Sequence, residues 1–353
     1  MSPPRHIFSI VILLLFAFSA ACSPASAYNA GSAQNPLSTS VERTLTSTNI
    51  GIQPPGGKST SSPLPPLPTK NSLGIAKCQM GKNPLAGLSG ASINACVTAF
   101  QFPLSRPIQP PANDKVEQSY RYGSTQNGQR EPHHGVEFIN PAGTPVLAAA
   151  HGLVVVAGTD DETAYADEVN FYGRLVVIRH DVPGLGQPLF TLYGHLLKVV
   201  VEPGDKVEAG HQIGEVGVGG VAAGTHLHFE VRLGENSYLT TRNPELWLEP
   251  RQDDGGQPRG ALAGRILDSQ GNFLAIDNIV IKALSDSGQV VSNNYLKTYE
   301  DLKMVGLDPW NESFALSDLP AGQYRISFIY RHPQVYDVQV LPGQLTVITM
   351  LGE

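Results

Sequence analysis

The residues of this sequence best suited to chemistry are its histidines, of which there are 10. His226 and His228 stand two positions apart in an apolar stretch. Side chains alternate between the faces of a strand, so this spacing places both imidazoles on one face, about 6.6 Å apart. Both rings can therefore reach one centre, where one can bind a metal ion while the other acts on a substrate.

A second pair, His133 and Glu137, offers an imidazole and a carboxylate four residues apart. In an extended strand they would lie about 13 Å apart, too far to bind one ion. We therefore expect the chain to bend between them at Gly135, which has no side chain to prevent it. Two imidazoles and one carboxylate, with water in the fourth position, make a typical open zinc site.

Each of these signals also has a structural interpretation. A single His-x-His pair on a strand is more often structural than metal-binding, and His-x-x-x-Glu alone is weaker still. Their combination is more informative, because only 16% of the chain is charged and burying an unpaired imidazole or carboxylate costs several kcal/mol. For four isolated histidines we keep the structural interpretation, as a strand end for His180 and as turns or surface for the rest: His151, His211 and His332.

The elements that must position these residues are short strands. The chain has 36 Gly and 28 Pro and little apolar periodicity of 3.6 residues, which predicts an all-β fold. Short apolar runs alternate with turns, which predicts a compact β domain over 100–250. A polar linker is expected over 251–258, followed by a second all-β unit over 259–353. No membrane-spanning run is expected after the N-terminal segment.

Five sequence blocks follow one another in the first β domain: HHGVEF at 133–138, GTPV at 143–146 with AAAHG at 148–152, YGHL at 193–196, GDKV at 204–207 with GHQIG at 210–214, and GTHLHFEVR at 224–232. In order and spacing they resemble the lysostaphin/LytM-type zinc endopeptidase domain. The resemblance implies a compact antiparallel β domain with its site in a groove. It also implies that the substrates are the peptide crosslinks and stems of bacterial peptidoglycan.

Carried over block by block, the resemblance implies that His133 and His228 bind Zn²⁺ and that Glu137 replaces the family's aspartate ligand. It makes His195 and His226 the catalytic histidines that activate water or stabilise the transition state. The departure is Glu137, because the extra methylene of glutamate moves the carboxylate by about 1.5 Å. Since zinc accepts glutamate in other His-His-Glu sites, we expect an active zinc metalloendopeptidase.

Other classes of function are alternatives to this enzyme. One is a catalytically degenerate domain of the same fold that binds wall peptides or activates a partner hydrolase. A biotinyl- or lipoyl-type carrier is disfavoured, because no lysine occupies a tight turn flanked by Met or Asp. Nucleic-acid binding is disfavoured by the net charge of −7. The bond cut, a Gly-Gly bond or a D-amino-acid crosslink, and the oligomeric state stay open.

The N-terminus predicts export from the cytoplasm. The apolar run 7–21 follows Arg5 and has the length of a signal-peptide core, giving a signal peptide over 1–27. Cleavage after Ala27 would release a secreted protein, whereas cleavage before Cys22 would leave a lipidated cysteine as the only membrane anchor. A Ser/Thr/Pro-rich stretch over 28–75 predicts a disordered tether. In the segment 76–99, Cys78 and Cys96 can form a disulfide.

The C-terminal unit carries a second resemblance. GRILD at 264–268, FALSDLPAGQYRI at 314–326 and VLPGQ at 340–344 resemble the carboxypeptidase regulatory-like or prealbumin-like β-sandwich. Modules of this kind bind or space other domains. We find no catalytic set of residues in this one, and its role stays open.

Overall fold

The computed structural model describes residues 94–98, 102–301, 304 and 306–352. The predicted signal peptide with Cys22 and the predicted tether lie outside these residues, and so does Cys78 of the predicted disulfide. No helix among the described residues is long and apolar enough to cross a membrane. We call residues 102–250 the first region, and residues 251–352 the second region.

The described chain consists of strands and two short 3-10 helices, which confirms the all-β prediction. The first region contains β2 Val136–Ile139, β3 Pro145–Leu147, β4 Gly152–Thr159, β5 Arg174–His180, β6 Leu189–Gly194, β7 Leu196–Val199, β8 Lys206–Val207, β9 Gln212–Val216, β10 His226–Leu233, η1 Tyr238–Thr240, β11 Thr241–Arg242 and η2 Pro244–Leu246. The second contains β12 Gly260–Leu267, β13 Ile279–Leu284, β14 Val290–Leu296, β15 Phe314–Leu319, β16 Gly322–Tyr330, β17 His332–Val340 and β18 Leu345–Leu351. One more strand, β1 Asn94–Thr98, precedes both regions.

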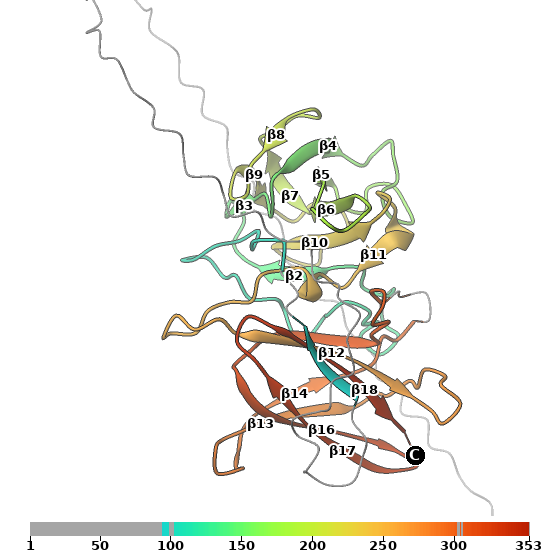
Figure 1. Cartoon of the computed structure of the whole chain (residues 1–353). Helices are drawn as coiled ribbons and strands as arrows, with labels where there is room; N and C mark the ends of the chain where they lie inside the picture. Colours follow the sequence, from blue (N-terminus) through green and yellow to red (C-terminus); the bar gives the residue numbers. More distant parts are fainter. Residues whose placement is uncertain (1–93, 99–101, 302–303, 305, 353) are drawn as a thin grey trace, which may run out of the picture. The chain divides into compact units, whose positions relative to one another are not determined.

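The first region is organised around a seven-stranded sheet, drawn in green to yellow in Figure 1. Its order is β11-β10-β6-β5-β4-β8, with β2 also paired to β10, and β3, β9 and β7 form a separate sheet. Every strand pair in this region is antiparallel. Apolar side chains such as Phe138, Tyr193 and Phe229 are buried in its core, which supplies the main free energy of folding.

Strand β10 is the element that organises the site. It pairs with β2 and with β6, and His228 stands directly opposite both Glu137 and Gly194. Residues opposite each other in an antiparallel pair carry their side chains on the same face, about 4.5–5.5 Å apart at Cβ. The register therefore brings the carboxylate of Glu137 to the imidazole of His228.

The second region has two four-stranded sheets, β1-β18-β12-β15 and β14-β13-β16-β17. Residues of both sheets, among them Ile266, Ile281 and Ile326, bury one common core. Strands β12 and β18 run parallel, and β1 pairs antiparallel with β18. A strand from the predicted segment 76–99 thus extends a sheet of the second region. The resemblance of this region to regulatory-like β-sandwiches stays a prediction.

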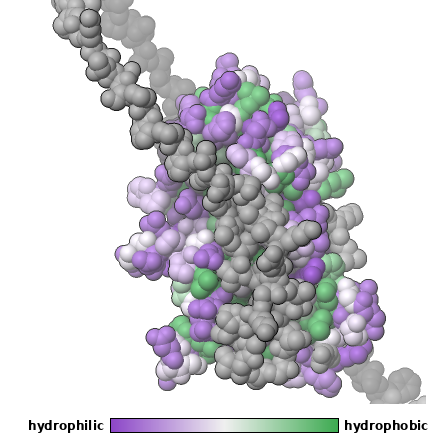
Figure 2. Space-filling view, in the orientation of Figure 1, coloured by the Kyte–Doolittle hydropathy of each residue, from purple (hydrophilic) through white to green (hydrophobic). Residues whose placement is uncertain are grey.

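The two regions also share apolar contacts. Ala261, Ala263 and Val347, from the sheet that contains β12, belong to the buried core of the first region. Arg106 of the first region forms an ion pair with Asp318 of the second, with 2.7 Å between Nη2 and Oδ1. On the face drawn in Figure 2, exposed hydrophobic residues lie scattered among hydrophilic ones, as is normal for a folded surface.

Candidate metal centre

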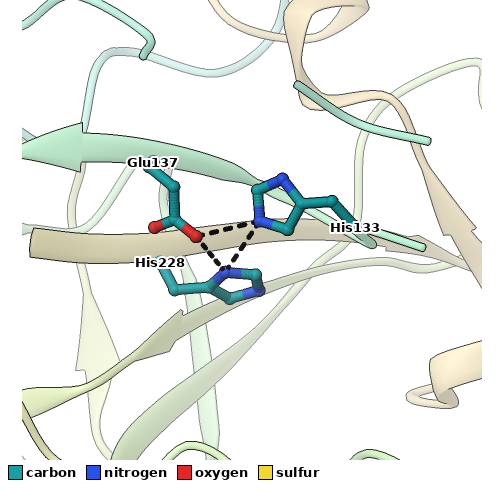
Figure 3. A group of neighbouring side chains, drawn as sticks. All are labelled: His133, Glu137 and His228. Atoms are coloured by element: carbon teal, nitrogen blue, oxygen red, sulfur yellow. Dashed lines mark hydrogen bonds and ion pairs between the residues drawn. The ribbon is translucent and has the colours of Figure 1, made fainter. Parts of the chain in front are cut away.

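Three buried side chains converge at the end of β2 and β10: His133, Glu137 and His228 (Figure 3). Nε2 of His133 lies 2.9 Å from Oε1 of Glu137, and Nδ1 of His228 lies 3.1 Å from the same oxygen. The two nitrogens are 3.3 Å apart. Ligands about 2.0–2.1 Å from a tetrahedral zinc lie about 3.4 Å from one another. The donor set thus fits a zinc ion in both chemistry and spacing.

The chain brings His133 to Glu137 in the way that the predicted bend requires. His133 precedes β2, and its backbone N–H donates to the Ser124 carbonyl at 3.0 Å. Between the two residues, Gly135 packs directly against β10. A Cβ added at Gly135 would lie 2.5 Å from the Phe229 carbonyl oxygen and 2.8 Å from Cε1 of His228. Glycine is needed here because the backbone of the loop passes so close to the strand.

Each candidate histidine ligand is oriented by a partner on its other ring nitrogen. Nδ1 of His133 donates to the Tyr120 carbonyl at 2.9 Å, and the Tyr120 ring stacks on the imidazole at 4.0 Å between centroids. Nε2 of His228 donates to Oε1 of Glu230 at 3.0 Å. These contacts turn Nε2 of His133 and Nδ1 of His228 towards Glu137, where each nitrogen can bind an ion once it carries no proton. Metal-binding histidines in proteins are commonly fixed in this way.

The partner of His228 belongs to a buried ionic network. Glu230 and Arg232 are both fully buried, with 2.8 Å between Oε2 and Nε. The Tyr172 hydroxyl donates to Oε1 of Glu230 at 2.5 Å and accepts from Nη2 of Arg232 at 3.0 Å. Nη1 of Arg232 donates to Asn236 at 3.0 Å. The network fixes a carboxylate behind the candidate ligand.

Glu230 and Arg232 lie within the motif block at 224–232, but the family resemblance gives no role to either residue. The signal that could have found them is strand parity. On β10, both residues share the face of His226 and His228, because all four positions differ by even numbers. Charged residues that follow one another on one buried face of a strand need partners for their charges and hydrogen bonds. The structure shows these partners.

Electrostatics in the cluster follow from burial and these pairs. Burial raises the pKa of Glu230, but Arg232 and then His228 outweigh it and hold that pKa at about 2. Burial lowers the pKa of His228, but the carboxylates of Glu137 and Glu230 raise it to about 9. For His195, burial and then the neighbouring His228 lower the pKa to about 3. His195 is therefore a neutral imidazole near pH 7.

His195 and His226 lie together beside the three candidate ligands, with 4.9 Å between their ring centroids. Nδ1 of His195 donates to the Gly219 carbonyl and Nδ1 of His226 to the Gly224 carbonyl, each at 2.8 Å. Nε2 of His226 lies 2.9 Å from Oε2 of Glu137. The backbone of His195 has a φ of +60°, an uncommon conformation for a residue other than glycine. Each ring is thus held through Nδ1.

All five predicted site residues line one cavity of about 670 Å³. Its other walls include aromatic and apolar side chains, namely Tyr120, Phe171, Tyr238, Ile139 and Val221. Cavities of roughly 300–1,000 Å³ with a few convergent polar groups are typical ligand sites. The structure therefore brings the predicted set into one open cavity.

The isolated histidines lie elsewhere, as the structural interpretation expected. His180 is buried at the end of β5, where Nδ1 donates to the His151 carbonyl at 2.8 Å and Nε2 lies 2.8 Å from the Thr191 hydroxyl. The other three are exposed: His151, His211 and His332. His134, next to His133, stacks on Tyr238 at 3.8 Å and contacts Thr241. It thus supports the cavity wall.

The region that contains this fold and this donor set is similar in sequence to known proteins. Residues 131–239 match the model of Peptidase family M23. Peptidoglycan DD-endopeptidase ShyA of Vibrio cholerae is 37% identical over 100 residues, which cover 28% of this chain and 20% of that protein. The Lipoprotein NlpD/LppB homolog of Pseudomonas aeruginosa is 35% identical over 98 residues, 28% of each chain. The first region therefore contains a peptidase M23 domain, homologous to LytM/lysostaphin-type endopeptidases.

The match is confined to this domain. The chain spans less than a third of the length of either relative. Among solved structures, the catalytic domain of lysostaphin from Staphylococcus simulans aligns at 31% identity and a TM-score of 0.30, covering 37% of this chain and 88% of that chain. The family match begins two residues before His133 and ends after Tyr238, so it includes every predicted site residue.

Proposed function

We propose that this chain is a zinc metalloendopeptidase that hydrolyses peptide bonds in bacterial peptidoglycan. The observation that carries the proposal is the buried set His133, Glu137 and His228, whose three donor atoms lie 2.9–3.3 Å apart. Similarity to the peptidoglycan DD-endopeptidase ShyA supports the substrate class. Ligand roles for these three residues are part of the proposal.

Zinc bound by these residues would polarise the scissile carbonyl and lower the pKa of a water molecule towards 7. The side chains beside it supply the proton transfers. The Nδ1–H of His226 donates to the Gly224 carbonyl. Its Nε2 is therefore the atom that accepts a proton from the attacking water. His195 presents Nε2 in the same way. The proton that one of these two Nε2 atoms accepts from the water leaves on the departing amine, and the ring that carries it in the meantime can donate to the developing oxyanion.

The proposed location is outside the cytoplasm. The apolar run 7–21 has the features of a signal peptide, and one relative is named a lipoprotein. We propose either a lipid anchor at Cys22 or a secreted chain that begins after Ala27. Mass spectrometry of the N-terminal peptide distinguishes them, because lipidation adds a large defined mass to Cys22.

Zinc content and digestion products test the proposal directly. Purified full-length protein should contain one zinc per chain and release shorter peptides from crosslinked muropeptides. His228→Ala should lose zinc. By contrast, His195→Ala or His226→Ala should keep zinc and lose turnover by about 10²- to 10⁴-fold, as expected for a general acid or base. Equal zinc loss in His226→Ala and His228→Ala would contradict the division between ligand and base.

Glu137 also supports a second candidate, a degenerate domain that binds wall peptides or activates a partner hydrolase. In the family that the sequence resembles, an aspartate stands at this position. Glu137→Gln should weaken zinc binding, since a neutral amide is a poorer ligand than a carboxylate. Glu137→Asp should also weaken it in a site built for the longer side chain. If wild type and both variants bind zinc alike, Glu137 is not a ligand and the docking function is the better description.

A further inference from the structure

A second cavity, of about 450 Å³, lies between the loop 118–129 of the first region and residues 295–299 of the second. It neighbours the cavity of the candidate metal centre, because Ser119 and Gln126 line both. Its volume falls within the roughly 300–1,000 Å³ of typical ligand sites. A substrate bound at the candidate metal centre would reach the second cavity by passing these two residues.

The charges in this second cavity are largely neutralised by pairs within the protein. Arg121 forms an ion pair with Glu245. Lys297 lies 2.7 Å from both Oε1 of Glu300 and Oδ1 of Asn127. Asp277 is exposed and adds one negative charge. Such a lining has no unpaired cation for a phosphate or a peptide carboxylate, so it favours an uncharged polar ligand.

The lining offers hydrogen-bonding amides. Four side-chain amides that line the cavity form no hydrogen bond with any other described residue: Gln118, Gln126, Gln129 and Asn278. A side-chain amide has both donors and an acceptor, so it can pair with a hydroxyl or an acetamido group in either sense. Sugars carry such groups at high density.

An aromatic platform completes the lining. Tyr295 on β14 is 67% exposed. The rings of Tyr122 and Tyr299, which also line the cavity, meet edge to face at 5.2 Å, and the Tyr299 ring would contact any Cβ at Gly123, at 2.6 Å. An exposed aromatic ring offers a flat apolar face to the C–H face of a sugar ring. The packed pair makes part of the lining rigid.

The loop 118–129, which forms one wall, contacts the first candidate ligand, His133, and is held by the second region. The carboxylate of Glu300 accepts from both the backbone N–H and the hydroxyl of Thr125. The Glu300 N–H donates to the Gly123 carbonyl at 2.9 Å, and the Gly123 N–H donates to the His133 carbonyl at 2.8 Å. One continuous set of contacts thus joins both cavities.

From these features we propose that the second cavity binds a neutral saccharide, namely the glycan to which the substrate peptide is attached. This inference rests on the proposed function for its substrate. The peptide would lie at the metal centre while the sugars contact Tyr295 and the free amides. The second region would then contribute to substrate binding and would be more than a spacer.

Binding of a linear N-acetylglucosamine tetramer to the full chain tests the inference without catalysis. Isothermal titration should give saturable binding to wild type, with or without zinc. Tyr295→Ala and Gln129→Ala should each raise the Kd by about tenfold, the effect of losing one good contact. Val291→Ala is the matched control, because Val291 is also exposed on β14 but does not line the cavity. It should bind like wild type.

Kinetics on paired substrates connect this binding to the reaction. The same crosslinked peptide should show a lower KM, by about tenfold, when the disaccharide is attached than after its removal, with kcat unchanged. Tyr295→Ala should abolish that difference. Equal KM values for both substrates together with no tetramer binding would overturn the inference, and so would binding of the sugar-free peptide in this cavity. Failure of hydrolysis alone would instead count against the proposed function, since tetramer binding does not require it.

Discussion

Two buried carboxylates, one in each region, sit in opposite electrostatic surroundings. Glu230 lies between Arg232 and His228, and although burial raises its pKa these neighbours hold it at about 2. Glu312 is also buried, but its hydrogen bonds come from neutral groups, among them the Leu307 N–H at 2.7 Å and the Tyr299 hydroxyl at 3.1 Å. Burial therefore raises the pKa of Glu312 to about 7. A buried carboxylate keeps its charge where a cation is buried with it.

The two buried carboxylates also have different roles in their regions. In the first region the charge of Glu230 orients His228, a candidate metal ligand. In the second region Glu312 accepts hydrogen bonds that hold the turn before β15. A neutral carboxyl group can accept such hydrogen bonds as well as a charged one can. Buried ion pairs are costly to desolvate and weak as a source of stability. The place of the Glu230–Arg232 pair next to the candidate metal centre indicates a positioning role rather than a stabilising one.

The largest effect on stability should come from removing the buried cation. Arg232→Met leaves Glu230 buried without its main partner, which should lower the free energy of unfolding by about 3–5 kcal/mol. Urea denaturation monitored by tryptophan fluorescence measures it. In the double variant Arg232→Met with Glu230→Gln, no uncompensated charge remains. The double variant should be more stable than the single one, and a single variant as stable as wild type would contradict the comparison.

Glu312 should make stability depend on pH. Its pKa is about 7 in the folded protein and about 4.5 in the unfolded chain, so the unfolded chain binds fewer protons between these values. The contribution of Glu312 to stability should thus be largest below about pH 4.5 and fall by about 3 kcal/mol as the pH rises through 7. Glu312→Gln should lack this decrease. The measurement is the wild-type minus variant difference in unfolding free energy from pH 4.5 to 8; a difference independent of pH would refute it.

The metal cluster could be predicted from the sequence, because strand parity and motif order are local properties. Strand parity placed His226 and His228 on one face, and the order of the motif blocks, through the family resemblance, joined them to His133 and Glu137. The all-β fold followed from composition and the alternation of short apolar runs with turns. These features depend on residues within one strand or one motif block.

The partners of the cluster could not be predicted, because they depend on contacts between distant segments. Tyr172 meets Glu230 across 58 positions of sequence, and the pairing of these loops and strands is not encoded in either segment alone. The parallel pairing of β12 with β18 and the addition of β1 to that sheet are of the same kind. No local pattern specifies which strands of a region become neighbours.

Loss of a hydrogen bond to charged partners should lower the free energy of unfolding by less than loss of the buried cation does. It should still lower it by more than loss of a hydrogen bond to a neutral partner does. Tyr172→Phe removes the hydroxyl that contacts both Glu230 and Arg232, which should cost about 1.5–3 kcal/mol and weaken zinc binding about tenfold or more through His228. Tyr324→Phe is the control in the second region, because its hydroxyl donates only to the Pro320 carbonyl at 2.7 Å. It should cost about 1 kcal/mol and leave zinc affinity unchanged. Equal zinc affinities in both variants would contradict the positioning role.

The smallest loss of stability should follow from breaking an ion pair at the surface. Like the buried pair of Arg232 and Glu230, this surface pair joins a guanidinium to a carboxylate. Arg325 of β16 stands opposite Asp337 of β17 and binds it at 2.7 and 2.8 Å through Nε and Nη2. The Arg325 side chain is 46% exposed, so water and salt screen the pair and little desolvation energy is at stake. Arg325→Met should therefore change the free energy of unfolding by at most about 1 kcal/mol. This cost should shrink further in 1 M NaCl, where the Debye length is about 3 Å. A loss as large as that of Arg232→Met would mean that burial is not what distinguishes the two pairs.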